Sequence, residues 1–246
     1  MEKIMEKENC YKIAVLVCGQ LREFNIGVKS WDCLFDLNCD FYFSTWDKSS
    51  QSKKKWPNYL DNNEIKITKN MVTDTIPNAI VSVLNEEDYG YINKDKITDK
   101  QILHWKNTLK ICMDSNIKYD VIIVTRPDVF LHLPDLLNYI NNLKENEIRN
   151  TSFGDLSNFF EDIFFMGKFN TIKTFIENLK ESEITYIHED LYTYLISLNF
   201  FLNSFPFDLK ATEVRPVINE LYIKNIDYDT VKLSNSEFIL KYGEQN

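Results

Sequence analysis

Histidine and cysteine are scarce in this sequence of 246 residues. The five cysteines include no Cys-x-x-Cys pair, and their odd number fits no disulfide framework. The three histidines are scattered along the chain, so the sequence indicates no His/Cys metal cage of the zinc-ribbon kind. We therefore expect reduced thiols, as in a cytoplasmic protein.

Positive charge and long apolar runs are also in short supply. Lysine and arginine number 28 against 37 aspartates and glutamates, which gives a net charge of −9. Binding to a nucleic acid backbone needs clustered cations, so we expect no nucleic acid partner. No apolar run approaches the length of a membrane span, and the polar residues 1–9 lack the apolar stretch of a signal peptide. The oligomeric state cannot be predicted from these features.

Continuous apolar runs and helical spacing alternate along the chain, which predicts an α/β fold with a parallel central sheet in a single domain. The predicted strands are Lys12–Cys18, Asp40–Thr45, Ala79–Leu84, Tyr119–Thr125 and Asp162–Met166. The predicted helices are Phe24–Phe35, one beginning at a capping box of Thr98 and Gln101, and two beginning at Asn170 and His188. We expect a polar lead over residues 1–11, a catalytic domain over residues 12–217 and a C-terminal extension over residues 218–246.

Three polar clusters follow predicted strands, at the sheet edge where α/β proteins bind ligands. They are Gly19, Gln20 and Arg22; Thr45, Trp46 and Asp47; and Arg126 and Asp128. They offer a carboxylate for a metal, two guanidinium groups for phosphate, an indole for stacking and a glycine for close approach. Taken singly, each residue also fits an ordinary structural role. Asp128, as a loop carboxylate, is expected to contribute little to folding.

Glycine-rich phosphate loops are missing from the sequence. Neither a Walker loop nor a Gly-x-Gly-x-x-Gly motif follows the first strand, which argues against the common ATPases and dinucleotide dehydrogenases. Phosphate must then be bound by side chains or by a metal ion. The predicted ligand is a nucleoside diphosphate.

Five segments resemble, in order, the small GT-A-type glycosyltransferases of large DNA viruses and surface-polysaccharide gene clusters. The segments are Ala14–Arg22, Phe43–Asp47, Tyr119–Asp128, Glu161–Gly167 and His188–Asp190. This resemblance implies a GT-A-like, Rossmann-related fold whose central sheet is mixed and mostly parallel, flanked by helices. It also implies transfer of a sugar from a nucleoside diphosphate sugar to a glycan or other hydroxyl acceptor, in the host cytoplasm if the protein is viral.

Members of that family usually bind Mn²⁺ or Mg²⁺ through an Asp-x-Asp motif. The matching tripeptide here is Arg126-Pro127-Asp128, which lacks the first aspartate. By resemblance, Asp128 is the expected metal ligand. A fixed cation such as Arg126 could replace the metal in part, so the metal requirement stays open.

An inverting transferase needs a carboxylate base opposite the diphosphate. Asp190 is the first candidate, because it begins a predicted helix near the edge of its apolar face, whereas Glu189 projects further toward solvent. Asp162 is the reserve candidate. Helix capping explains the two helix residues equally well. Two other functions stay open, a nucleotidyltransferase and a degenerate transferase domain that only binds.

Overall fold

The computed structural model describes residues 11–49, 65–90, 97–151, 160–180, 184, 187–205 and 210–213. Most of the predicted N-terminal lead and the whole predicted C-terminal extension lie outside these residues. No helix among the described residues has the length and apolar character needed to cross a bilayer.

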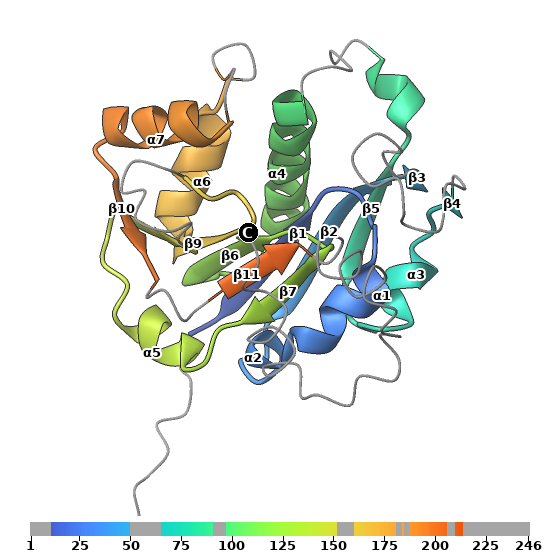
Figure 1. Cartoon of the computed structure of the whole chain (residues 1–246), viewed down its shortest axis with the longest axis horizontal. Coiled ribbons are helices and arrows are strands. Elements are labelled where there is room, and N and C mark those ends of the chain that lie inside the picture. The colour runs from blue at the N-terminus through green and yellow to red at the C-terminus, as the bar shows by residue number, and fades with distance from the viewer. Residues whose placement is uncertain are drawn as a thin grey trace, which may run out of the picture.

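A seven-stranded sheet forms the centre of the molecule (Figure 1). Its order is β10 (Phe201–Ser204), β8 (Glu147–Asn150), β9 (Phe164–Lys168), β6 (Val121–Thr125), β1 (Ile13–Cys18), β2 (Asp40–Trp46) and β5 (Ile80–Leu84). Strand β9 is antiparallel to both of its neighbours, and the other neighbouring pairs are parallel. The predicted mixed, mostly parallel α/β sheet is confirmed.

Alternating residues of β1 face two separate hydrophobic layers, as the period of a strand requires. Ile13, Val15 and Val17 belong to one layer, and Ala14 and Leu16 belong to the other. The first layer is covered by α1 (Phe24–Gly27), η1 (Val28–Ser30), α2 (Asp32–Phe35) and α5 (Leu136–Asn141). The second is covered by α4 (Ile97–Asp114), α6 (Phe169–Asn178) and α7 (Ile187–Ser197), which Figure 1 shows together on one side of the sheet.

Short elements complete the fold. They are β3 (Lys48–Ser49), β4 (Ile65–Lys66), α3 (Asn70–Thr73), η2 (Glu86–Tyr89), β7 (Val129–His132) and β11 (Lys210–Glu213). Strands β7 and β11 form an antiparallel ribbon outside the main sheet. Strand β7 begins directly after Asp128, so it fixes the path of the loop that leaves β6.

The predicted helix at Phe24–Phe35 is wrong as one continuous element, because it is divided into α1, η1 and α2. Contacts with β7 explain the division. The Ser30 hydroxyl accepts a hydrogen bond from the Leu131 amide at 2.8 Å, and the Trp31 indole donates to the Val129 carbonyl at 3.1 Å. These tertiary bonds hold the segment against β7 in place of a regular helix.

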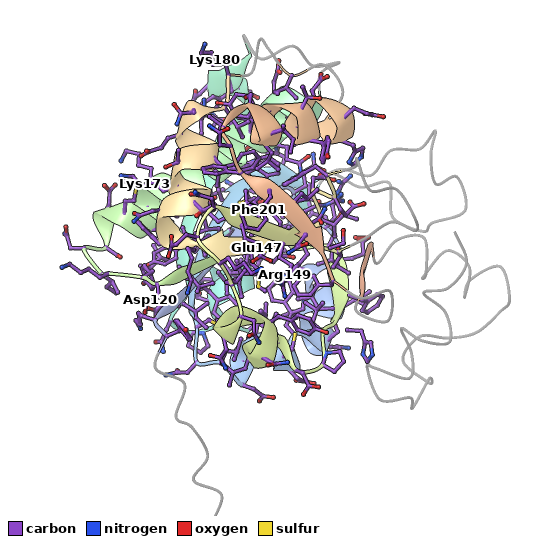
Figure 2. The ribbon with its side chains drawn as sticks, turned by 90° about the vertical axis from the view of Figure 1, so that its left-hand side faces the viewer. Asp120, Glu147, Arg149, Lys173, Lys180 and Phe201 are labelled. Atoms are coloured by element: carbon purple, nitrogen blue, oxygen red, sulfur yellow. The ribbon has the colours of Figure 1, made fainter. Side chains whose placement is uncertain are left out.

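Strand β8, which lies next to the edge strand β10, carries a buried ion pair of Glu147 and Arg149 (Figure 2). Glu147 is fully buried, and its carboxylate accepts hydrogen bonds from Arg149, from Asn203 and from the Lys144 amide. Burial alone would raise the pKa of Glu147, but these hydrogen bonds and the positive charge of Arg149 hold it below its usual value. This pair joins β8 to β10 and serves the fold.

Candidate functional site

The carboxyl ends of β1, β2 and β6 meet at one edge of the sheet, and the reversed strand β9 begins at that same edge. Thr125, at the end of β6, pairs with Phe164, at the start of β9. Residues that follow β6 therefore lie beside residues that precede β9. This register brings the Arg126–Asp128 loop and the Glu161–Asp162 pair to one place on the molecule.

Two arginines converge on Asp128. The Arg126 guanidinium donates two hydrogen bonds to the Asp128 carboxylate, from Nε and Nη2, each at 2.9 Å. Arg22 Nη2, from the loop after β1, lies 3.8 Å from Asp128 Oδ2. The side chains of Arg22 and Arg126 are 20% and 18% exposed, whereas Asp128 is 2% exposed. The expectation that Asp128 is a surface carboxylate with little structural duty is wrong, since it is the buried counter-ion of both arginines.

A glycine allows this convergence. A Cβ on Gly27 in α1 would lie 2.6 Å from the Val129 carbonyl oxygen and 3.2 Å from the Pro127 carbonyl oxygen. Only a glycine lets α1 approach the backbone of the Arg126–Asp128 loop this closely. The contact thereby fixes the distance between the loop that carries Arg22 and the loop that carries Arg126.

Replacing Gly27 with alanine is expected to lower the free energy of unfolding by about 1–3 kcal/mol, because the added methyl group meets backbone atoms that cannot turn aside. Urea denaturation measures the change. Gly90→Ala is the matched control, because its Cβ would meet only the Glu87 carbonyl oxygen at an ordinary 3.5 Å. Equal effects of the two substitutions would contradict the close-approach role of Gly27.

The loop after β1 opens with Gly19, whose φ of +122° lies in a region that disfavours side chains. Its amide donates to the Ser44 carbonyl of β2 at 3.0 Å. Gln20 follows, and its buried Oε1 atom has no hydrogen-bond partner among the described residues. The loop that carries Arg22 is thus anchored to the neighbouring strand.

The last residues of β2, Thr45 and Trp46, and the following Asp47 pack against neighbouring segments. Thr45 is buried, and Trp46, 2% exposed, packs edge-on against Tyr89 and His104. Asp47 Oδ1 accepts a hydrogen bond from the Glu86 amide at 3.1 Å. These contacts give Trp46 and Asp47 structural roles, and their contact with a nucleotide stays a prediction.

Two buried carboxyl groups precede β9. Glu161 and Asp162 are 4% and 6% exposed, and they share a side-chain hydrogen bond. The Gln101 amide, from the first turns of α4, donates to Asp162 Oδ2. His188 Nδ1 lies 3.9 Å from Asp162 Oδ1 and 2.8 Å from the Phe160 carbonyl oxygen, to which it donates. Asp162 thus bonds to a residue of α4 and lies beside a residue of α7.

Burial is the main cause that raises the pKa of Glu161 to about 8, and the charge and hydrogen bond of Asp162 add to it. The positive charge of Arg126 acts in the opposite direction. The raised pKa favours the protonated form of the Glu161 side chain at neutral pH.

Stability should fall as the pH rises from about 4.3, where an unfolded glutamate ionises, to about 8, because the folded state holds the Glu161 proton more tightly. Glutamine resembles the protonated side chain, so Glu161→Gln should remove this part of the pH dependence. Urea denaturation at a series of pH values, in the presence of EDTA, measures both curves. Parallel curves for parent and variant would contradict the proton on Glu161.

The first turn of α7 carries the two remaining predicted residues. The Phe160 amide donates to the His188 carbonyl at 3.3 Å, which holds the start of α7 beside Asp162. Glu189 is exposed and Asp190 is half-buried, in agreement with their predicted exposures. Each helical residue turns by about 100°, so Asp190 lies about 200° around the helix from His188, away from the side that faces Asp162. Helical geometry therefore points Asp190 to a different side of α7 from His188.

Asp128 and the cluster before β9 differ in how well they fit a divalent ion. Asp128 does not fit, since both of its oxygens accept hydrogen bonds from Arg126 and a second guanidinium stands beside it. Glu161, Asp162 and His188 each place one ligand atom within 4.8 Å of the others. These three are the residues of the described chain that could hold Mn²⁺ or Mg²⁺. Binding would displace the proton of Glu161.

Glu161, Gln101 and His188 are site residues that sequence reasoning did not select. Gln101 was expected to complete a capping box with Thr98, but α4 begins one residue before Thr98 and the Gln101 amide bonds to Asp162. Glu161 stands beside Asp162 in the segment Glu161–Gly167, which resembles the glycosyltransferases. The sequence feature that could have identified Glu161 is a pair of adjacent acidic residues directly before an apolar strand.

A groove of about 650 Å³ lies at the opposite edge of the sheet, beside Tyr119, Asp120 and Lys168. It contains none of the residues predicted for the site. Asp120 there accepts a hydrogen bond from the Lys12 amide, and Lys168 stands over the Tyr11 ring. We place the candidate site at the edge where the arginines and the buried carboxyl groups converge.

No family model and no curated protein matches the chain. One solved structure that it resembles is described as a glucose-1-phosphate thymidylyltransferase from Bacillus anthracis in complex with sucrose. The identity is 11%, the match covers 92% of this chain and 98% of that one, and the TM-score is 0.46. At this similarity, the function has to be argued from the residues of the site.

Proposed function

We propose that this protein is a glycosyltransferase that moves a sugar from a nucleoside diphosphate sugar to a glycan or other hydroxyl acceptor. One observation carries the proposal: the register of β6 and β9 brings the Arg126–Asp128 loop beside the buried pair of Glu161 and Asp162, and Arg22 joins Arg126 on the Asp128 carboxylate. The ordered segments that resemble GT-A glycosyltransferases support the same activity.

The two halves of this site have the chemistry that sugar transfer requires. Guanidinium groups bind phosphate oxygens and stabilise the negative charge that develops on a departing diphosphate. A carboxylate removes the proton of the attacking hydroxyl. Asp162 is the base that we propose, in preference to Asp190, because Gln101 fixes its carboxylate and it lies at the edge where β6 ends.

A nucleotidyltransferase is the second candidate. Such an enzyme needs acidic metal ligands at this edge, and the cluster of Glu161, Asp162 and His188 could supply them. It would release pyrophosphate from a nucleoside triphosphate, whereas a glycosyltransferase releases a nucleoside diphosphate. The two candidates therefore differ in their products.

A thermal-shift screen of UDP, GDP, dTDP and CMP sugars, with and without Mn²⁺, tests the proposed donor class. A ligand present at 100 times its dissociation constant stabilises the fold by about 2.7 kcal/mol. We expect at least one nucleoside diphosphate sugar to raise the melting temperature. No shift with any sugar nucleotide would favour a domain that does not bind this donor class.

A further inference from the structure

The positive charge at the end of β6 is built into the protein. A divalent ion at Asp128 would have to displace both hydrogen bonds from Arg126, and it would stand against the guanidinium of Arg22, 3.8 Å from the same carboxylate. Like charges at that spacing repel strongly in a partly buried site. The place that a metal would take is therefore already filled by two organic cations.

The two guanidinium groups are held in position before any ligand arrives. Arg126 is fixed by its two-point pair with Asp128, and Arg22 reaches the same carboxylate from the loop after β1. Gly27 holds the two loops together through its close approach to Pro127 and Val129. Because an arginine fork matches the geometry of phosphate oxygens, two such groups on one counter-ion suit two linked phosphates.

We infer that Arg22 and Arg126 bind the diphosphate of the donor directly, with Asp128 positioning the arginines and holding no metal ion. This inference rests on the proposed function and specifies how its donor is held. The two positive charges and the charge of Asp128 leave a net single positive charge, which attracts the negative diphosphate. As the bond to the sugar breaks, the electron pair and negative charge that pass to the diphosphate are stabilised by the same guanidinium groups.

Calorimetric titration of the parent with UDP, GDP, dTDP and inorganic pyrophosphate, in EDTA and in MnCl₂, tests this inference without measuring activity. We expect at least one nucleoside diphosphate to bind in EDTA with an affinity within about threefold of that in Mn²⁺. A nucleoside diphosphate that binds only with Mn²⁺ would overturn the inference and leave the proposed function standing.

Arginine variants locate the binding site. In EDTA, Arg22→Ala and Arg126→Ala should each weaken the nucleoside diphosphate by about 10- to 150-fold, the range for a lost charge-assisted hydrogen bond. Arg126→Lys should restore only part of the loss, because lysine keeps the charge without the fork. Lys110→Ala, an exposed lysine paired with Asp114 on α4, removes the same charge and should have no effect. Equal affinities in all four variants would overturn the inference.

Arg126→Ala leaves the buried Asp128 carboxylate without its two-point partner, so its folding is checked by thermal unfolding. Arg22→Ala provides the test if that variant does not fold, because Arg22 makes the longer contact with Asp128. If no nucleoside diphosphate binds in either condition, the proposed function is contradicted. In that case, pyrophosphate could still bind to the parent in EDTA. If the Arg22→Ala variant no longer bound it, the result would support a phosphate site at the arginines.

Discussion

Replacing Asp162 with asparagine is expected to lower the turnover number of sugar transfer by about a hundredfold or more, the usual effect of removing a general base. Asparagine keeps the shape and can still accept the hydrogen bond from Gln101, but it cannot take a proton from the acceptor. Affinity for the donor should change by less than about threefold, because the lost interaction is made in the transition state. Steady-state kinetics and donor titration separate the two effects.

Two variants on α7 are the comparators for Asp162→Asn. Asp190 lies on the side of the helix away from His188, and Glu189 is exposed, so Asp190→Asn and Glu189→Gln should each keep most of the turnover. Full activity of Asp162→Asn together with loss of activity in Asp190→Asn would move the base to α7, where the sequence had placed it. If all three variants stay active, the mechanism is retaining or uses another base.

Arg126→Ala should reduce the rate of the chemical step as well as the affinity for the donor. The diphosphate gains negative charge as it leaves, and removing one preorganised donor to such a charge costs about 100- to 1,000-fold in rate. Single-turnover measurement at saturating donor isolates this step from binding. The expected order is parent and Lys110→Ala fastest, Arg126→Lys intermediate and Arg126→Ala slowest.

An unchanged single-turnover rate in Arg126→Ala, with weaker donor binding, would mean that Arg126 holds the diphosphate equally well before and during the reaction. The guanidinium would then contribute to affinity alone. That outcome would contradict its role in leaving-group stabilisation.

The central strands were predictable because they are buried on both faces. β1 and β6 are continuous runs of apolar residues, and the structure places them within two residues of the predicted ranges. Strands β8 and β10 have no such run, since β8 contains Glu147 and Arg149 and β10 ends in polar residues. Their pairing depends on contacts between segments distant in the sequence.

The direction of β9 decides the composition of the site, and no local pattern encodes it. Sequence reasoning placed Asp162 at the opening of a strand, and it could not tell that this opening lies beside the end of β6. The sequence pattern also does not predict which side chains at the strand ends are buried. Trp46 ends β2 and Asp128 follows β6, and both were expected to face a ligand. Trp46 packs against Tyr89 and His104 instead, and Asp128 is paired with Arg126.

The products formed from two substrate mixtures test the proposed glycosyltransferase most directly. One mixture contains a nucleoside diphosphate sugar that the protein binds, with a simple sugar alcohol as hydroxyl acceptor and water as the alternative acceptor of the sugar. The other contains the matching nucleoside triphosphate and sugar 1-phosphate. Phosphorus NMR distinguishes a released nucleoside diphosphate from released pyrophosphate. We predict that the first mixture yields the free nucleoside diphosphate, that this release depends on Asp162, and that the second mixture yields no pyrophosphate. Pyrophosphate release from the second mixture, with the first unchanged, would contradict the account and assign the site to nucleotidyl transfer.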